Sequence, residues 1–137
     1  MQHLHNTKEL PLFAIPIVMR ATMNEILVLS TTDTLDLAQK IASALVRAHE
    51  AACVNIVPGI RSVYCWEGKE CNDQEFLLLI KSSMESFEAI RDRIRQLHSY
   101  QVPEIIALPI TAGDPPYLAW LRDTVGVEGK RSKGIKE

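Results

Sequence analysis

The sequence predicts an α+β fold in which two helices cover one face of an antiparallel sheet. Three observations lead to this prediction. Segments with the periodicities of strands and helices follow one another in the order β-α-β-β-α-β. Two of the strand segments are joined by a short turn, which is typical of an antiparallel hairpin. The length of 137 residues, with 47% hydrophobic and 23% charged residues, is that of one soluble globular domain.

The first strand is predicted over Glu25 to Thr31, a run of strand length with β-forming side chains. A polar cluster follows, and Asp33 within it is the predicted N-cap of a helix of about residues 34–49. Apolar residues recur along this helix at three- and four-residue spacing, which predicts one buried face. These residues are Leu37, Ala38, Ile41, Ala42, Leu45 and Ala48.

A long hairpin is predicted next. Its first strand, Ala52 to Trp66, is interrupted only by Pro58-Gly59, which indicates a bend or a bulge. Residues Glu67 to Glu70 turn the chain. Cys71 to Lys81 returns it and ends in a nearly continuous apolar run, as expected of a strand that is covered on both faces.

The second half of the chain repeats the helix and strand pattern. Ser82 with Glu85 three residues later is typical of a capping box, and a helix of about residues 84–97 is predicted after it. A fourth strand is predicted over Glu104 to Thr111, and a proline pair precedes a short helix from Tyr117 to about Asp123. This order of elements is that of the ferredoxin-like split β-α-β arrangement, β-α-β-β-α-β.

The predicted elements divide the chain into three parts. Residues 23–125 form the expected domain. Residues 1–22 are expected to be an N-terminal arm outside the core, either disordered or an upstream start, because Met23 stands just before the first convincing strand. Residues 126–137 are rich in glycine and charged side chains and are expected to be a flexible charged tail.

The net charge and the cysteine content limit the classes of partner, and the cellular compartment, that we expect for this protein. The formal net charge of -2 provides no broad basic field for nucleic acid or an anionic membrane. The apolar stretch from Leu10 to Met19 contains two prolines and is too short to span a bilayer. Its flanks also do not fit a signal peptide. Three cysteines without a CxxC motif fit a reducing compartment, so we expect a cytoplasmic protein that binds neither nucleic acid nor membrane.

The predicted hairpin is longer than the domain that carries it. A strand from Ala52 to Trp66 spans roughly 50 Å, whereas a compact chain of this length has a diameter of about 35–40 Å. Tyr64 and Trp66 are two residues apart, so they share one face of the strand and would be exposed in a monomer. A second copy that pairs its own hairpin along this edge would cover them. A ligand groove is the alternative.

Carboxylates gather around the hairpin turn, with lysines nearby. They are Glu67, Glu70, Asp73 and Glu75, beside Lys69 and Lys81. These side chains form either a solvated turn or, together with the two aromatic residues, the lining of a cleft between subunits.

Enzyme signatures are absent from the sequence: it contains no Walker loop, GxGxxG, HExxH, GxSxG or EF-hand pattern. Acylphosphatase-type enzymes with this fold hold phosphate with an arginine in the loop after the first strand. That loop, Ser30 to Thr34, here contains Asp33, which would repel phosphate. A nucleophile and base pair for a small hydrolase cannot be assembled either. We therefore expect no catalysis.

Cysteines and one histidine are the candidate metal ligands, because thiolates bind copper(I) and zinc well. Cys65 and Cys71 flank the hairpin turn and would face each other across a three-residue loop, while Cys53 lies earlier on the strand. Free cysteine is also typical of packed cores. His98 follows a helix, where the helix dipole favours it without any ligand role.

Five short strings go beyond the pattern of the fold. They are AACVN at 51–55, PGIxSxYxWxGK at 58–69, FxLxIK at 76–81, HxYxxPEIIALPI at 98–110 and YLxW at 117–120. In this order they resemble the CutA family of divalent-cation tolerance proteins over about residues 24–125. The resemblance implies a homotrimer similar in assembly to the PII signalling proteins, a link to copper and other divalent cations, and no established catalysis. No cofactor is expected to be obligatory.

The resemblance also implies site residues. Copper ligands assigned in some bacterial members correspond to Ser30, Leu97 and His98, so only His98 is retained as a good ligand. His98 is the first metal-ligand candidate and Cys53, in the AACVN string, is the second. One copy supplies too few ligands, so a site would be shared between subunits or completed by water. The cleft or trimer interface is expected to include Tyr64, Trp66, Glu67, Lys81, Tyr100 and Glu104.

A second function follows from the same assembly. A PII-like signalling module would bind a small anionic ligand in the clefts between subunits and pass its state to an unidentified protein partner. Arg61, Lys69 and Lys81 are the cations that would hold such a ligand.

Overall fold

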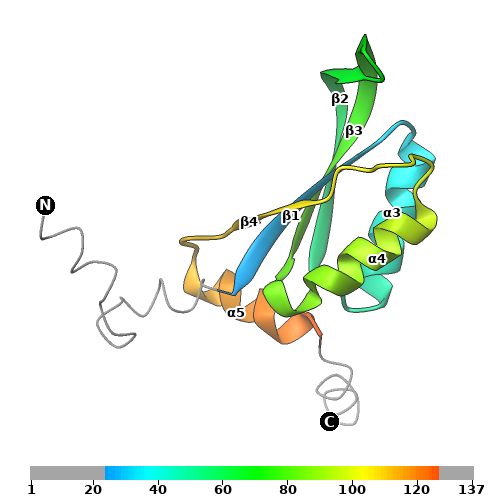
Figure 1. Ribbon diagram of the computed structural model, residues 1–137. Coiled ribbons are helices and arrows are strands. Elements are labelled where there is room, and N and C mark those ends of the chain that lie inside the picture. Colours follow the sequence, from blue (N-terminus) through cyan, green and yellow to red (C-terminus); the bar gives the residue numbers. More distant parts are fainter. Residues whose placement is uncertain (1–23, 127–137) are drawn as a thin grey trace, which may run out of the picture.

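The fold is described from a computed structural model, which describes residues 24–126 of the chain (Figure 1). The expectations for the arm 1–22 and, apart from Gly126, for the tail 126–137 lie outside the described residues. The elements are β1 (Glu25–Thr32), α3 (Leu35–Arg47), β2 (Cys53–Trp66), β3 (Lys69–Ser83), the 3-10 helix η2 (Met84–Ser86), α4 (Phe87–Leu97), β4 (Ile106–Pro109) and α5 (Pro115–Thr124).

The four strands form one antiparallel sheet in the order β2-β3-β1-β4. Helices α3 and α4 lie together on one face of it (Figure 1). This is the predicted ferredoxin-like arrangement, and the predicted α+β fold class is confirmed. Among the described residues, no helix is long and apolar enough to cross a membrane.

The core lies between this sheet face and the two helices. It forms because every second residue of β1 and β3 points toward the helices, whose apolar residues recur every three or four positions. Its fully buried members include Ile26 and Val28 from β1, Leu78 and Ile80 from β3, Ile41 and Leu45 from α3, and Ile90 and Ile94 from α4. The alternate strand residues point to the opposite face, where Ile106 and Leu108 of β4 remain 50% and 46% exposed.

Two predicted helix starts are wrong in detail. Thr34, not Asp33, is the N-cap of α3, and its hydroxyl oxygen accepts a hydrogen bond of 3.1 Å from the amide of Leu37. The capping box at Ser82 does not form, because the Ser82 hydroxyl donates instead to the carbonyl oxygen of Glu50 at 2.5 Å. The 3-10 turn η2 therefore precedes α4.

The last strand and helix also differ from the predicted bounds. Regular pairing of β4 covers only Ile106–Pro109, and one further hydrogen bond joins the amide of Ile110 to the carbonyl of Glu25. Helix α5 begins at Pro115, two residues before its predicted start.

The hairpin contains the predicted bulge, since the pairing of β2 with β3 shifts between Val57 and Ile60. Gly59 has a φ of 74 there, a left-handed conformation that favours glycine. The hairpin then projects beyond the rest of the domain (Figure 1). It ends in a two-residue turn, Glu67-Gly68, in which both residues have positive φ.

This tight turn separates the two cysteines beside it. Cys71 pairs with Tyr64 and Cys65 pairs with Glu70, so the two thiols lie at neighbouring register positions. Neighbouring positions point to opposite faces of a strand pair. The three-residue loop that would bring Cys65 opposite Cys71 is therefore not present.

Candidate functional site

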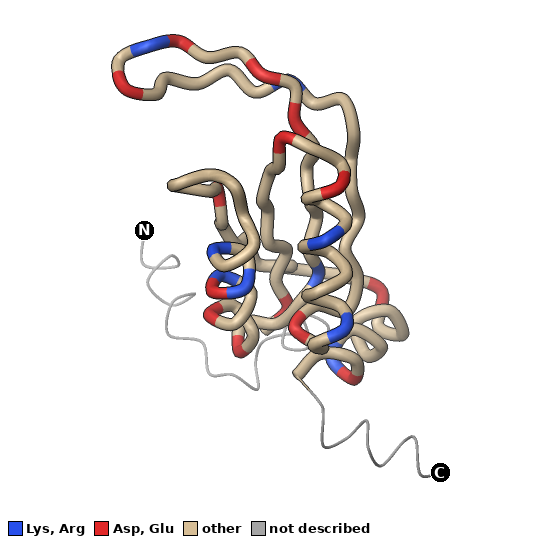
Figure 2. Tube along the Cα trace, turned by 90° about the vertical axis from the view of Figure 1, so that its right-hand side faces the viewer, with Lys and Arg blue, Asp and Glu red and all other residues tan. Residues whose placement is uncertain are grey.

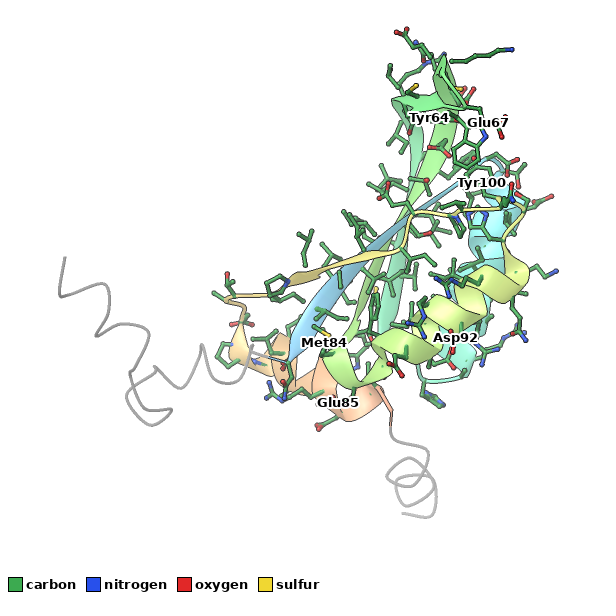
Figure 3. The ribbon with its side chains drawn as sticks, viewed as in Figure 1. Tyr64, Glu67, Met84, Glu85, Asp92 and Tyr100 are labelled. Carbon is green, nitrogen blue, oxygen red and sulfur yellow. The ribbon has the colours of Figure 1, made fainter. Side chains whose placement is uncertain are left out.

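A cleft of about 670 Å³ opens between the hairpin and the connection from α4 to β4. Its lining residues are Thr31 of β1; Arg61, Ser62, Val63, Tyr64 and Trp66 of β2; Glu75 of β3; and Tyr100, Gln101, Val102 and Glu104 of the connection. Figure 3 shows Tyr64 on the hairpin and Tyr100 on the facing connection. Four of the residues predicted for a cleft, Tyr64, Trp66, Tyr100 and Glu104, therefore line the same space.

Tyr100 joins the connection to the hairpin. Its hydroxyl donates a hydrogen bond of 2.6 Å to Oε2 of Glu75. Burial and then this hydrogen bond raise the pKa of Tyr100 above its ordinary value. Glu75 lines the cleft and is only 5% exposed, so this hydrogen bond holds a nearly buried carboxylate of the lining.

Tyr64 lies nearer the tip of the hairpin. Its hydroxyl donates to Oδ2 of Asp73 at 2.5 Å, and this hydrogen bond is the main cause that raises the pKa of Tyr64 to about 12. This hydrogen bond crosses from β2 to β3. Trp66 follows two residues later and is 44% exposed. The upper part of the cleft is therefore aromatic.

His98 does not line the cleft itself, but it contacts two residues that do, Thr31 and Tyr100. Its Nε2 lies 2.7 Å from the carbonyl oxygen of Thr31, and its Nδ1 lies 3.0 Å from the amide nitrogen of Tyr100. A carbonyl only accepts and an amide only donates, so we assign the neutral ring with its proton on Nε2. The ring centroids of His98 and Tyr100 are 4.5 Å apart. His98 thus positions Tyr100, and both of its nitrogens are bonded to backbone.

Cys53 and Lys81 lie elsewhere. Cys53 begins β2, is half-buried and pairs with Lys81 of β3, at the end of the strands far from the turn. Within one chain, Lys81 therefore does not join Tyr64 and Trp66 in the cleft, and its place at a subunit interface stays a prediction. Cys53 and His98 do not approach each other within one chain. Among residues 24–126, no group of three or more histidine, cysteine, aspartate or glutamate side chains is arranged to hold a metal ion.

The charged residues around the hairpin also divide between the cleft and other parts of the chain. Glu67 lies in the turn itself, and acidic residues continue down the projecting arm (Figure 2). Of the three cations predicted for an anion site, Arg61 alone lines the cleft, because Lys69 is at the tip and Lys81 at the far end.

Several cleft residues were not predicted from the sequence. Thr31, Gln101 and Val102 line the space, and Glu75 was grouped with the turn carboxylates without its burial being foreseen. Gln101 and Val102 stand inside the HxYxxPE string, so that string already marked the segment. Proximity of Thr31 and Tyr100 depends on chain packing and has no local signal.

The fold and the cleft define a split β-α-β domain with a projecting hairpin and a ligand-sized cleft at its base. Within this class, residues 26–124 match the family model of the CutA1 divalent ion tolerance protein. The chain therefore belongs to the CutA1 family. The family is named for ion tolerance and not for an enzymatic reaction.

Relatives and solved structures agree with this membership. The divalent-cation tolerance protein CutA of Thermus thermophilus is 49% identical over 102 residues, which are 74% of this chain and 99% of that protein. The chloroplastic CutA of Arabidopsis thaliana is 46% identical over 103 residues, which cover 75% of this chain but 57% of the relative. The Thermus thermophilus structure has a TM-score of 0.73, with 74% and 99% of the two chains covered. The Oryza sativa CutA1 structure has a TM-score of 0.75 at 41% identity, covering 79% and 99%.

Proposed function

We propose that this chain is a homotrimeric protein of the response to metal ions, which binds copper or a similar divalent cation in the cytoplasm without catalysing a reaction. Membership of the CutA1 family supports the link to divalent cations. The name of the Thermus thermophilus relative, a divalent-cation tolerance protein, supports the same link.

The observation that carries the assembly is the apolar sheet face opposite α3 and α4. Its register brings together side chains from three strands: Leu27 and Leu29, Leu77 and Leu79, and Ile106 and Leu108. Large apolar patches of this kind mark contact surfaces between proteins. The projecting hairpin adds Trp66 and an unpaired edge along β2. The threefold number rests on the resemblance to the family.

The metal site in this proposal uses His98 as its first ligand and Cys53 as its second. The two lie on separate parts of one chain, so ligands from different subunits or water must complete the coordination. Coordination through Nδ1 of His98 breaks the hydrogen bond from the Tyr100 amide. Metal binding therefore competes with the contact that positions Tyr100.

Native mass spectrometry of the full chain tests both parts. The chain is measured alone and then with copper or zinc under reducing conditions. We expect three subunits with about one metal ion per chain, reduced in His98→Ala and retained in Cys65→Ser, whose thiol is exposed on the hairpin. A trimer that takes up no metal contradicts the metal proposal. A monomer contradicts the assembly.

A further inference from the structure

Glu75 is a nearly buried carboxylate that has no cationic partner among the described residues. It is 5% exposed, and its Oε2 is bonded to Tyr100. Within residues 24–126, neither an ion pair nor a hydrogen bond engages its other oxygen. A carboxylate removed from water is stabilised by a counter-charge. Because Glu75 lines the cleft, the cleft is the space from which a cation can reach it.

The other lining residues favour the same charge. Glu104 adds a second carboxylate, whereas Arg61 is the single cation that lines the cleft in the described part of the chain. Arg61 is exposed and forms no ion pair with either carboxylate there. Two carboxylates against one guanidinium leave the lining net negative. A small anion would meet this charge at close range.

The walls of the cleft distinguish an organic cation from a metal ion. Tyr64 and Tyr100 contribute two aromatic rings that do not depend on Trp66, the residue assigned to the proposed subunit contact. Aromatic faces attract ammonium and guanidinium groups and also cover the carbon chain attached to them. A metal ion instead requires several converging donor atoms. The volume of about 670 Å³ lies within the range of small-molecule sites, about 300–1,000 Å³.

We infer that the cleft binds a small organic cation of the primary amine or guanidinium class, with its charged group on the Glu75 carboxylate and its carbon chain against the aromatic wall. This function goes beyond divalent-cation binding and does not depend on it. His98 contributes by positioning Tyr100, which holds Glu75 in place.

Isothermal titration calorimetry of the full chain tests the inference with two probes of similar length. Agmatine carries an amine and a guanidinium group, and glutarate carries two carboxylates. We expect saturable binding of agmatine that weakens with added salt, and no binding of glutarate. Binding of glutarate in place of agmatine, or no binding of agmatine, contradicts the inference.

Substitutions then assign the site. Glu75→Gln removes the charge but keeps an oxygen that accepts the Tyr100 hydrogen bond, and we expect it to weaken agmatine binding by roughly tenfold or more. Glu70→Gln is the matched control, because Glu70 lies on the same hairpin but outside the lining. If Glu75→Gln does not fold, Glu104→Gln tests the same wall. Equal binding by the cleft variant and Glu70→Gln contradicts the site.

A zinc titration separates this inference from the proposed metal function. Zinc binding that is lost in Glu75→Gln, with agmatine failing to bind, would make the cleft a metal site and the inference wrong. If zinc binding is lost in His98→Ala and agmatine still binds in the presence of zinc, the two ligands use separate sites and the inference stands. The subunit number and metal uptake measured by native mass spectrometry do not depend on agmatine.

Discussion

The imidazole of His98 bridges two backbone groups, with Nε2 2.7 Å from the carbonyl oxygen of Thr31 and Nδ1 3.0 Å from the amide nitrogen of Tyr100. The bridge joins the end of β1 to the connection that follows α4. It therefore sets the position from which the Tyr100 hydroxyl reaches Glu75. The residue that the sequence suggested as a metal ligand already has a structural role.

Replacement of His98 by alanine should destabilise the metal-free protein. Two hydrogen bonds are lost and a partly buried carbonyl and amide lose their partners, which costs about 1–3 kcal/mol of the free energy of unfolding. Urea unfolding in the presence of a chelator measures the change. An unaltered midpoint in His98→Ala would show that the bridge does not contribute to stability.

Tyr64 should ionise at a higher pH in the folded protein than in the unfolded chain. The hydrogen bond to Asp73 raises the pKa of Tyr64 from 10.0 to about 12. A raised pKa means that the protonated form is favoured by folding, so its stabilising contribution is full below pH 10.0 and is lost as the pH rises through about 12. Phenolate absorbance during an alkaline titration reports this step. Tyr64→Phe should remove it.

Asp73→Asn tests the cause of the shift. Loss of the carboxylate charge and its hydrogen bond should lower the pKa of Tyr64 toward its ordinary value. Glu70→Gln serves as the control, because Glu70 is a hairpin carboxylate that makes no bond to Tyr64. A Tyr64 ionisation that Asp73→Asn does not alter would contradict the assignment.

Two arginines on α4 should differ in their effect on stability. Arg93 bonds the Glu50 carboxylate through Nε at 2.6 Å and Nη2 at 3.0 Å, in a partly buried pair. Within the part of the chain that the structure describes, Arg91 forms an ion pair only with the neighbouring Asp92, whose side chain is exposed. Arg93→Gln should therefore lower the free energy of unfolding by about 1 kcal/mol. Arg91→Gln should leave it nearly unchanged.

Urea unfolding of the two arginine variants side by side provides the measurement. Equal midpoints would mean that the two-point contact to Glu50 has no more effect than an exposed pair. A larger loss in Arg91→Gln than in Arg93→Gln would reverse the prediction.

Local patterns were sufficient to predict the order of elements. These patterns are strand and helix periodicities, a proline pair and a glycine in the hairpin turn. Each is determined by residues close together in the chain, so each can be identified in a single sequence. The shared face of Tyr64 and Trp66 follows from the same reasoning, because side chains alternate along a strand. The predicted bulge at Pro58-Gly59 is present for this reason as well.

Contacts between distant residues were not predicted. His98 and Thr31 are 67 positions apart, and their hydrogen bond depends on how α4 docks on the sheet. The burial of Glu75 has no signature in a hairpin rich in carboxylates. Lys81 was grouped with the cleft because it is close to the hairpin turn in sequence, but within one chain β3 carries it to a position opposite Cys53, at the end of the strands away from the turn.

The last prediction concerns assembly. Trp66 is 44% exposed near the tip of the projecting hairpin, where a second copy would cover it. Trp66→Asp introduces a charge that would have to be buried in that contact, so it should shift the chain from the proposed trimer toward smaller species. Met84→Asp is the control, because Met84 is 53% exposed beside α4, away from the hairpin tip (Figure 3). Sedimentation velocity of both variants gives the subunit number. A Trp66→Asp protein that remains as trimeric as Met84→Asp would mean that the hairpin aromatics are not part of the subunit contact, and the apolar sheet face alone would then have to account for assembly.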